Sequence, residues 1–164
     1  RIEDLGSESL QGDIHFADLL ATMGARVTWE PWALEVIGPD RLDGIDADMN
    51  DLSDTAPTMA VLGPFARKAV RIRNIGHVRW QESDRLHAVA TELSRLGVRA
   101  EESAGGLDVY PSPVSSAAVH TYDDHRIAMS FALIGLKVPG IRILDPGCVA
   151  KTFPDYFQKL EELR

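Results

Sequence analysis

The fold expected for this chain is decided by a short pattern that occurs twice, first as Met23-Gly24-Ala25-Arg26-Val27 and later as Leu96-Gly97-Val98-Arg99-Ala100. The likeness extends outward from it, because Leu34-Glu35-Val36 is matched by Leu107-Asp108-Val109 at the same offset of 73 positions. Each copy has room for one helix and several strands. Such a repeated unit predicts stacked layers of helix and sheet around a shared core.

Hydrophobic periodicity predicts the same series of elements in both copies. For the first copy we expect a helix over Asp13–Met23, strands over Arg26–Glu30, Ala33–Ile37 and Ile45–Met49, a helix from Asp54 to Ala66 and a strand over Val70–Ile75. For the second we expect a helix over Gln81–Leu96, strands over Arg99–Glu102, Leu107–Tyr110 and Ala117–Thr121, a helix over Ile127–Leu136 and a strand over Ile141–Leu144. A short last helix should open at Pro154. The prediction is an α/β protein with internal repeats at about residues 10–75 and 80–146.

The composition fits one ordinary domain with a core of its own. The 164 residues are 45% hydrophobic and carry a net charge of −8. A nucleic acid or an anionic membrane surface would require a basic face, so we expect neither as a partner. An anionic ligand would have to be held by a local cluster of cations.

The cysteine and histidine content argues against a disulfide and a metal site. The single Cys148 cannot form an internal disulfide and fits a reducing, cytoplasmic compartment. Metal-ligand spacing and a glycine-rich phosphate loop are both missing, so we expect no metal and no cofactor. There is also no signal peptide and no apolar run of membrane-spanning length. The chain begins at Arg1 inside a predicted strand, and we expect it to be a fragment without its N-terminal part.

Four short stretches place charged side chains at predicted helix starts. They are Asp54-Thr55-Ala56-Pro57, Gln81-Glu82-Ser83-Asp84-Arg85, Asp123-Asp124-His125-Arg126 and Lys151-Thr152-Phe153-Pro154. A helix N-terminus carries unpaired N–H groups and partial positive charge, so it favours anions. Arginines, a lysine and carboxylates gathered at such ends indicate acid–base chemistry on a phosphorylated or carboxylated small molecule.

Glu82 and Arg85 continue the apolar face of their predicted helix toward its start. They are three positions apart, and each lies four positions before an apolar residue of that face. A charge on a buried face requires a partner or a ligand. An internal Glu82–Arg85 ion pair with Ser83 or Asp84 as the helix cap explains this pattern as well as a functional site does.

Simple structural roles compete with functional ones at the other stretches. Asp124 and Asp54 can each be interpreted as a helix N-cap. Arg126 opposes the dipole of the apolar helix that it begins, which favours a role in gripping an anion. Lys151 can be an ordinary solvated lysine, and His125 is best interpreted as a structural histidine whose hydrogen bonds are satisfied.

Several of these motifs resemble the 5-enolpyruvylshikimate-3-phosphate (EPSP) synthase family. They occur in the family's order as Gln11-Gly12-Asp13, Asp48-Met49-Asn50-Asp51-Leu52-Ser53-Asp54, Arg79-Trp80-Gln81-Glu82-Ser83-Asp84-Arg85-Leu86, Thr121-Tyr122-Asp123-Asp124-His125-Arg126-Ile127-Ala128-Met129 and Lys151-Thr152-Phe153-Pro154-Asp155-Tyr156-Phe157. The resemblance implies the inside-out α/β barrel fold of the enolpyruvyl transferases, in which each domain has three βαβαββ units. It implies that residues 1–164 are most of the C-terminal domain, with about two of its three units, and that the N-terminal domain is absent.

The resemblance also implies an activity and a set of site residues. The family transfers the enolpyruvyl group of phosphoenolpyruvate to the 5-hydroxyl of shikimate 3-phosphate and releases phosphate, on the shikimate pathway to chorismate and the aromatic amino acids. By the motif match, Asp54 would be the general base for the hydroxyl, and Glu82 would transfer a proton at the methylene carbon. The same match implies substrate binding at phosphoenolpyruvate by Arg85, Arg126 and Lys151, and at shikimate 3-phosphate by Asp54, His77 and Gln81.

The chain departs from the family pattern at two positions. Gln81 stands where lysine is usual, and His77 stands where asparagine is common. We expect the isolated chain to be inactive, because the acceptor pocket draws on the absent half. One alternative is a UDP-N-acetylglucosamine enolpyruvyl transferase, which shares the fold but whose motifs fit less well. Another is a non-catalytic anion-binding paralogue, which Asp54 and Glu82 disfavour because anion binding alone does not favour neighbouring carboxylates.

Overall fold

The computed structural model describes residues 1–163 as short helices and strands. After strand β1 (Ile2–Glu3), the first series of elements comprises a 3-10 helix η1 (Gly12–His15), α1 (Phe16–Thr22), β2 (Arg26–Trp29), β3 (Ala33–Ile37), β4 (Ile45–Asp48), η2 (Asn50–Thr55), α2 (Ala56–Leu62), η3 (Gly63–Phe65) and β5 (Val70–Arg73). The second comprises η4 (Gly76–Trp80), α3 (Arg85–Arg95), β6 (Ala100–Ser103), β7 (Gly106–Val109), β8 (Ala118–Val119), α4 (His125–Ile134) and β9 (Arg142–Ile143). The last described elements are η5 (Pro146–Lys151) and α5 (Tyr156–Glu162).

The helices that lead into the candidate site are shorter than the periodicity predicts. The helix expected over Gln81–Leu96 starts only at Arg85, and the one expected over Asp54–Ala66 is divided into η2, α2 and η3. Pro64 lies in η3, where its missing N–H cannot continue the α-helical hydrogen bonds of α2. The apolar spacing therefore located both helices correctly but extended them into the loops that carry the charged motifs.

Strand pairing follows the same scheme in both series. Strands β2 and β3 form an antiparallel hairpin, as β6 and β7 do, whereas β4 pairs with β5 in parallel and β8 with β9 in parallel. The last strand of one series joins the next hairpin, because β5 pairs antiparallel with β7, and β1 pairs with β3 in the same manner. The result is a sheet in the order β4-β5-β7-β6 and a second sheet in the order β1-β3-β2.

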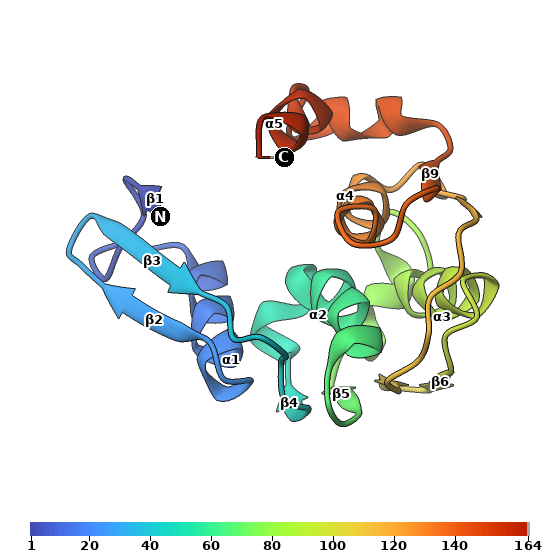
Figure 1. Cartoon of the computed structure of the whole chain (residues 1–164), viewed down its shortest axis with the longest axis horizontal. Helices are drawn as coiled ribbons and strands as arrows, with labels where there is room; N and C mark the ends of the chain where they lie inside the picture. The colour runs from blue at the N-terminus through green and yellow to red at the C-terminus, as the bar shows by residue number, and fades with distance from the viewer. Residues whose placement is uncertain (164) are drawn as a thin grey trace.

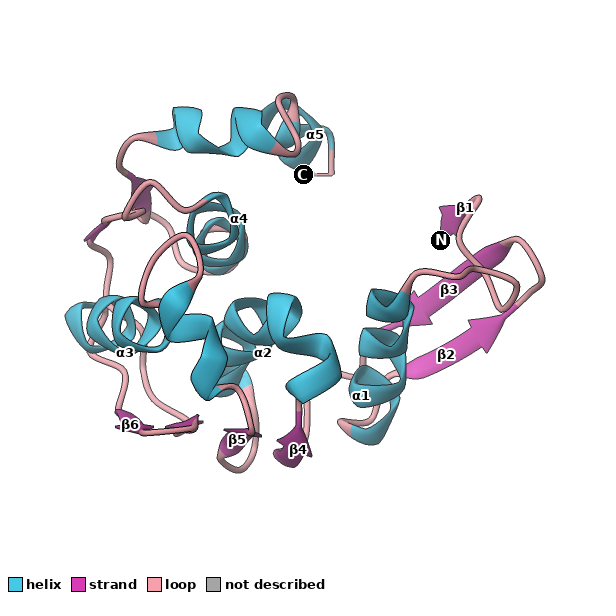
Figure 2. Cartoon of the chain, turned by 180° about the vertical axis from the view of Figure 1, so that it is seen from behind, coloured by secondary structure: helices cyan, strands magenta, loops and turns pink. Residues whose placement is uncertain are grey.

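The four-stranded sheet lies along one outer side of the molecule, and most of the helices are layered on one side of it (Figures 1 and 2). Strands β4, β5 and β6 run along one edge in both ribbon views, with α2 and α3 above them, α4 in the next layer and α5 beyond it (Figures 1 and 2). In β5, Val70 and Ile72 are fully buried, while Arg71 and Arg73 alternate with them and form ion pairs with Asp108. This alternation is what a strand with one solvated face requires.

Helix α4 is the centre of the core. Ile127, Ala128 and Phe131 have no exposed surface, so the helix is enclosed on most sides. It packs against α2, where Thr58 and the buried Ser130 share a hydrogen bond of 3.0 Å. Because α4 is held this firmly, the residues at its first turn have a fixed position relative to α2.

Within residues 1–163, no helix combines the length and apolar character needed to cross a membrane.

The turn before α4 has an unusual backbone. Tyr122 and Asp123 have positive φ angles of 56° and 55°, a conformation that residues other than glycine rarely adopt. These two successive residues lie in the connection from β8 to α4, which brings Asp124 to the start of α4. Surrounding contacts must hold this turn, because each such conformation costs roughly 1–2 kcal/mol.

Candidate active site

Arg85 is the centre of a charged cluster, although only 2% of its side chain is exposed. It is the first residue of α3, and Asp84 caps that helix by accepting a hydrogen bond from the His87 N–H at 3.0 Å. The guanidinium donates in three directions: Nε to Asp124, Nη1 to Asp54 and Gln81, and Nη2 to Glu82. A buried guanidinium is tolerable only when its donors are satisfied in this way.

Asp124 joins Arg85 to the start of α4 and is fully buried. Its Oδ2 accepts from the Arg85 Nε at 2.8 Å and from the Ser83 hydroxyl at 2.9 Å, and its Oδ1 accepts from the Arg126 N–H at 2.9 Å. The expected N-cap role of Asp124 is therefore confirmed. The same carboxylate also forms the most deeply buried ion pair of the cluster, at 2.8 Å between side chains that are 2% and 0% exposed.

Asp54 bridges the two arginines. Its Oδ1 accepts from Arg85 Nη1 at 3.0 Å, and its Oδ2 accepts from Arg126 Nη2 at 2.6 Å. The expectation that Asp54 is simply a helix N-cap is wrong, since Thr55 occupies the cap position of α2 and the Asp54 carboxylate faces the guanidinium groups instead. The cluster therefore draws on η2, α3 and α4 together.

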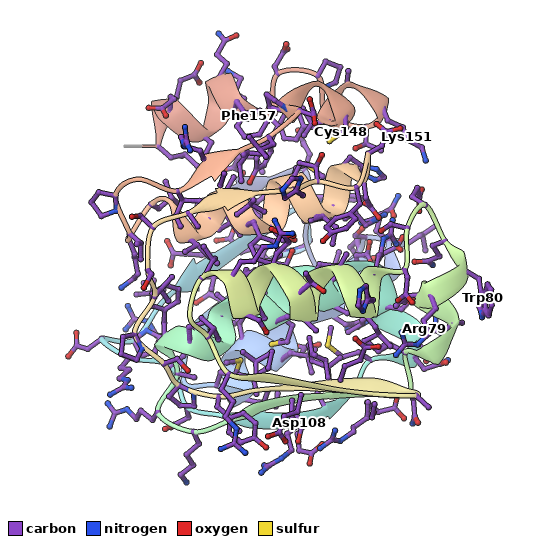
Figure 3. The ribbon with its side chains drawn as sticks, turned by 90° about the vertical axis from the view of Figure 1, so that its right-hand side faces the viewer. Arg79, Trp80, Asp108, Cys148, Lys151 and Phe157 are labelled. Atoms are coloured by element: carbon purple, nitrogen blue, oxygen red, sulfur yellow. The ribbon has the colours of Figure 1, made fainter. Side chains whose placement is uncertain are left out.

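Glu82 and Lys151 complete the cluster on its solvent side. Glu82 Oε2 accepts from Arg85 Nη2 at 2.6 Å, and its Oε1 accepts from the Lys151 ammonium at 2.6 Å. The hydrogen bond from Lys151 is the main reason that the pKa of Glu82 is lowered from 4.5 to about 2. Lys151 ends η5 rather than opening a helix, and its side chain is 57% exposed. It projects on the same side of the molecule as Trp80, which precedes Gln81 (Figure 3).

Besides Asp54, two residues were expected at the acceptor substrate, and they are placed differently from each other. Gln81 is in the cluster, because its side-chain oxygen accepts a hydrogen bond from Arg85. His77 lies exposed in η4 and takes no part in the cluster among residues 1–163. Gln81 is therefore a neighbour of Arg85 and His77 is not, and the substrate-binding roles that the resemblance implies for both residues stay predictions.

A hollow that borders η2 lies outside the cluster. It has a volume of about 890 Å³ and is lined at the ends of β4 and β5 by residues that include His15, Asp48, Asp51 and Asn74. Asp51 belongs to η2, the 3-10 helix that also carries Asp54. This hollow contains none of the predicted site residues, so the charged cluster is defined by its ion pairs.

Two other sequence expectations concern histidines. His125 is buried, and its Nδ1 has no hydrogen-bond partner among the described residues, so the expectation of a fully satisfied histidine is wrong. Burial lowers the pKa of His125, which keeps its ring neutral at neutral pH. Within residues 1–163, no group of three or more His, Cys, Asp or Glu side chains is arranged to hold a metal ion.

The geometry is that of a charge-balanced cluster in which cationic and carboxylate side chains pair with one another. Three cations and three carboxylates converge from four separate parts of the chain: Arg85, Arg126 and Lys151 with Asp54, Glu82 and Asp124. The family model for EPSP synthase (3-phosphoshikimate 1-carboxyvinyltransferase) matches residues 1–160. The chain belongs to the EPSP synthase family.

Relatives in the EPSP synthase family are closely similar over nearly the whole chain. The 3-phosphoshikimate 1-carboxyvinyltransferase of Trichormus variabilis is 52% identical over 159 residues, which cover 97% of this chain and 37% of the relative. That of Aeromonas salmonicida is 51% identical over 162 residues, covering 98% of this chain and 38% of the relative. The chain thus spans well under half the length of these relatives.

Solved structures show the same fold. An EPSP synthase from Acinetobacter baumannii matches with a TM-score of 0.86 at 22% identity, over 98% of this chain and 40% of that one. The enolpyruvyl transferase NikO from Streptomyces tendae matches with a TM-score of 0.71 at 27% identity, over 89% of this chain and 34% of that one. The expected α/β enolpyruvyl transferase fold is therefore confirmed.

Sequence reasoning missed the full part that Asp124 plays. It was assigned only a capping role, although the structure places it against both Arg85 and Ser83. A signal was present, because Asp124 begins a helix that is apolar on nearly every face. A carboxylate at the start of such a helix is enclosed by its neighbours, so it requires a cationic partner.

Proposed function

We propose that this chain forms the phosphoenolpyruvate-binding and proton-transfer part of an EPSP synthase. The reaction would join the 5-hydroxyl oxygen of shikimate 3-phosphate to the enolpyruvyl carbon of phosphoenolpyruvate and release phosphate. The observation that carries this proposal is the convergence of Arg85, Arg126 and Lys151 on the carboxylates of Asp54 and Glu82. Membership of the EPSP synthase family supports it.

In this proposal the cations hold the two anionic groups of phosphoenolpyruvate. Arginine forms paired hydrogen bonds with carboxylate or phosphate, and an ammonium acts as a compact positive charge. Arg126 and Lys151 are the accessible members, with side chains that are 28% and 57% exposed. Arg85 is reached only when one of its carboxylate partners moves aside, because its side chain is 2% exposed.

The carboxylates would transfer the protons. In the addition step, Asp54 takes the proton of the 5-hydroxyl group while the hydroxyl oxygen bonds to the central carbon of phosphoenolpyruvate. Glu82 protonates the methylene carbon in the same step. In the elimination step, Glu82 takes a proton back from the resulting methyl group, the carbon–oxygen bond to the phosphate breaks, and phosphate leaves. Each acid–base group of this kind typically contributes about 10²–10⁴-fold to the rate.

Ligand binding would also change the protonation of Glu82. With its pKa at about 2, Glu82 is ionised at neutral pH in the free chain. A bound anion would draw Lys151 away and place negative charge nearby, and both changes raise a carboxyl pKa. Glu82 would thereby gain the proton that an acid requires.

We also propose that the chain is most of one domain of a longer protein that acts in the cytoplasm. It spans 37–38% of the length of its relatives. The turn that follows β5 as Asn74-Ile75-Gly76 has counterparts after β1 and β9, as Asp4-Leu5-Gly6 and Asp145-Pro146-Gly147. In each of them the first residue has a positive φ angle, which supports a third unit built like the other two. The rest of the protein would supply most contacts to shikimate 3-phosphate.

Binding is tested by titrating the 164-residue chain with phosphoenolpyruvate and following amide chemical shifts by NMR. Lys151→Met should weaken binding about 10-fold, the effect of losing one charge-assisted hydrogen bond. Lys159→Met is a matched control, because its side chain is 56% exposed and also pairs with a glutamate, Glu162. Equal effects of the two variants, or no binding to the parent chain, would contradict the proposal.

Activity is tested in the longer protein that contains this chain. Phosphate release from phosphoenolpyruvate and shikimate 3-phosphate should be measured for the parent and for Glu82→Gln. The variant keeps the size of the side chain and cannot exchange a proton, so kcat should fall by roughly 10²-fold or more. Unchanged turnover would remove Glu82 from the chemistry, and turnover by the 164-residue chain alone would show that the remaining part is dispensable.

A further inference from the structure

Glu92 is a fully buried carboxylate that the proposed chemistry does not use. It lies on α3, seven residues after Arg85, and its side chain has no exposed surface. Its Oε1 accepts from the Tyr122 hydroxyl at 2.7 Å, and its Oε2 accepts from the His120 N–H at 3.0 Å. Arg95 also forms an ion pair with this carboxylate, with its Nε 3.5 Å from Oε1.

Both contacts of Glu92 go to the strained turn that precedes α4. Tyr122 is the first of the two residues with positive φ, and His120 is the residue that follows β8. Burial, followed by the bond to Glu92, raises the pKa of Tyr122 to about 12, so its hydroxyl remains a donor. The turn is closed by a hydrogen bond of 2.9 Å from the Asp124 N–H to the Thr121 carbonyl.

Helix α3 therefore holds this turn at two points. Arg85 binds Asp124 at the end of the turn, and Glu92 binds Tyr122 and His120 near its beginning. Seven residues make almost two helical turns, so the two side chains lie on one face of α3, about 10 Å apart along its axis. A rigid helix with two attachments fixes both the position and the orientation of the turn.

We infer that Glu92 is a positioning residue: it clamps the 120–122 turn to α3 and so sets the geometry of the Arg85–Asp124–Arg126 cluster. This inference rests on the proposed function, because its purpose is to keep the anion-binding cations in place. Among residues 1–163, Glu92 forms no hydrogen bond or ion pair with a side chain of the cluster. Its hydrogen bonds stabilise the strained conformation of Tyr122 and Asp123. This conformation places the Asp124 carboxylate where it accepts the hydrogen bond from Arg85 Nε.

The clamp is tested in the ligand-free 164-residue chain through the NMR signal of the Arg85 Nε–H, assigned as the signal that Arg85→Lys removes. Tyr122→Phe removes one bond to Glu92 and keeps the ring, so it is the milder variant, and Glu92→Leu removes both. Each should shift the Arg85 Nε–H signal and speed its exchange with water by about 2- to 10-fold, the range for one modest hydrogen bond. Glu92→Gln should restore a signal close to that of the parent, because its amide accepts from one partner and donates to the other.

A matched control separates this effect from a general loss of stability. Ile134→Val removes one buried methylene at the far end of α4, where the parent side chain is 1% exposed. It should lower the urea midpoint and leave the Arg85 Nε–H signal in place. An unchanged Arg85 signal in Tyr122→Phe and Glu92→Leu, or an equal shift in Ile134→Val, would overturn the inference.

Inorganic phosphate then distinguishes the clamp from the proposed function. Affinity of the parent chain for phosphate should fall about 2- to 10-fold in Tyr122→Phe and remain unchanged in Ile134→Val. If the parent chain binds no phosphate while Tyr122→Phe still shifts the Arg85 signal, the clamp stands and the proposed anion site fails.

Discussion

Replacing Asp124 with asparagine tests how much of the fold depends on the charged cluster. The substitution keeps the shape of the side chain but replaces one acceptor oxygen with a donor group. Asp124 accepts three hydrogen bonds, from Arg85, Ser83 and the Arg126 N–H, and its side chain has no exposed surface. An asparagine can satisfy only one side of this arrangement, because its NH₂ must face another donor on the other side.

The cost can be worked out for both orientations of the amide. If the amide oxygen faces Arg85, the helix cap is lost, which costs about 0.5–2 kcal/mol. If it faces the Arg126 N–H, the buried Arg85 Nε loses its acceptor, which costs about 1–3 kcal/mol. In both cases Arg85 also loses the charge of its most buried partner, but it keeps Asp54 and Glu82, so the loss stays below the 3–5 kcal/mol of a fully broken buried pair. We expect a total of about 3 kcal/mol.

Urea unfolding of the 164-residue chain, followed by far-ultraviolet circular dichroism and tryptophan fluorescence, measures this loss. For a domain of this size, about 3 kcal/mol lowers Tm by roughly 6–12 °C. Asp123→Asn is the matched control, since it makes the same chemical change at an exposed neighbour whose positive φ suits asparagine. It should change stability by less than about 0.5 kcal/mol. If Asp124→Asn unfolds at the urea midpoint of the parent, the buried ion pair does not stabilise the fold and the reasoning is refuted.

Three further changes test single contacts. Lys151→Met should raise the pKa of Glu82 from about 2 toward 4.5, as measured by its carboxyl ¹³C titration, and a pKa that stays near 2 would contradict the assigned cause. Because the folded pKa is lowered, ionised Glu82 stabilises the parent above pH 4.5 and this stabilisation is lost between pH 4.5 and 2, so the variant should lose less stability over that range. Gln81→Lys replaces an acceptor of Arg85 with a like charge and should lower the unfolding free energy by about 1 kcal/mol, whereas a higher urea midpoint would disprove this role. Tyr156→Phe removes a 2.8 Å hydrogen bond to a carbonyl of α4 and should cost about 1 kcal/mol in the same assay, and no loss would show that the bond is dispensable.

Hydrophobic periodicity predicted where the helices lie but not where they begin. The apolar spacing of the expected helix over Gln81–Leu96 continues through Glu82, yet α3 begins at Arg85. The reason is local: the Asp84 side chain accepts a hydrogen bond from the His87 N–H, which makes Asp84 the N-cap and Arg85 the first residue of α3. Periodicity reports the face that is buried, whereas a helix end is set by which side chain satisfies the free N–H groups.

The cluster was predicted from motifs, but of its connections only the Glu82–Arg85 ion pair was anticipated. From local spacing alone, Asp54 was interpreted as the N-cap of a predicted helix, but it pairs with Arg85 and Arg126, which lie 31 and 72 residues away. Nothing in local spacing distinguishes a carboxylate that caps its own helix from one that faces another helix. Only the packing of α2 against α4 brings Asp54 to Arg126.

Glu92 shows a signal that was present and not used. It lies three positions after Val89 and four before Leu96, the C-cap of α3, and both of these residues are buried. That placement on the apolar face is the same one that drew notice to Glu82 and Arg85. A charged residue inside an apolar stripe indicates a buried partner, and here the partners are a backbone N–H and a tyrosine hydroxyl.

The balance of charge in the cluster sets a condition on any anion that binds there. Each cation already has a carboxylate partner, so an incoming anion must exchange partners and cannot simply fill a positive site. The exchange is easiest at Lys151, which is the most exposed of the three cations. It would first affect Glu82, because Glu82 would lose the hydrogen bond from Lys151 that lowers its pKa. A site built only to bind would gain affinity by losing Glu82, because the carboxylate competes with the ligand for the same ammonium. The presence of Glu82 is explained if this competition has a function. An anion that takes Lys151 away from Glu82 also raises the affinity of Glu82 for a proton, and Glu82 is the group proposed to transfer one.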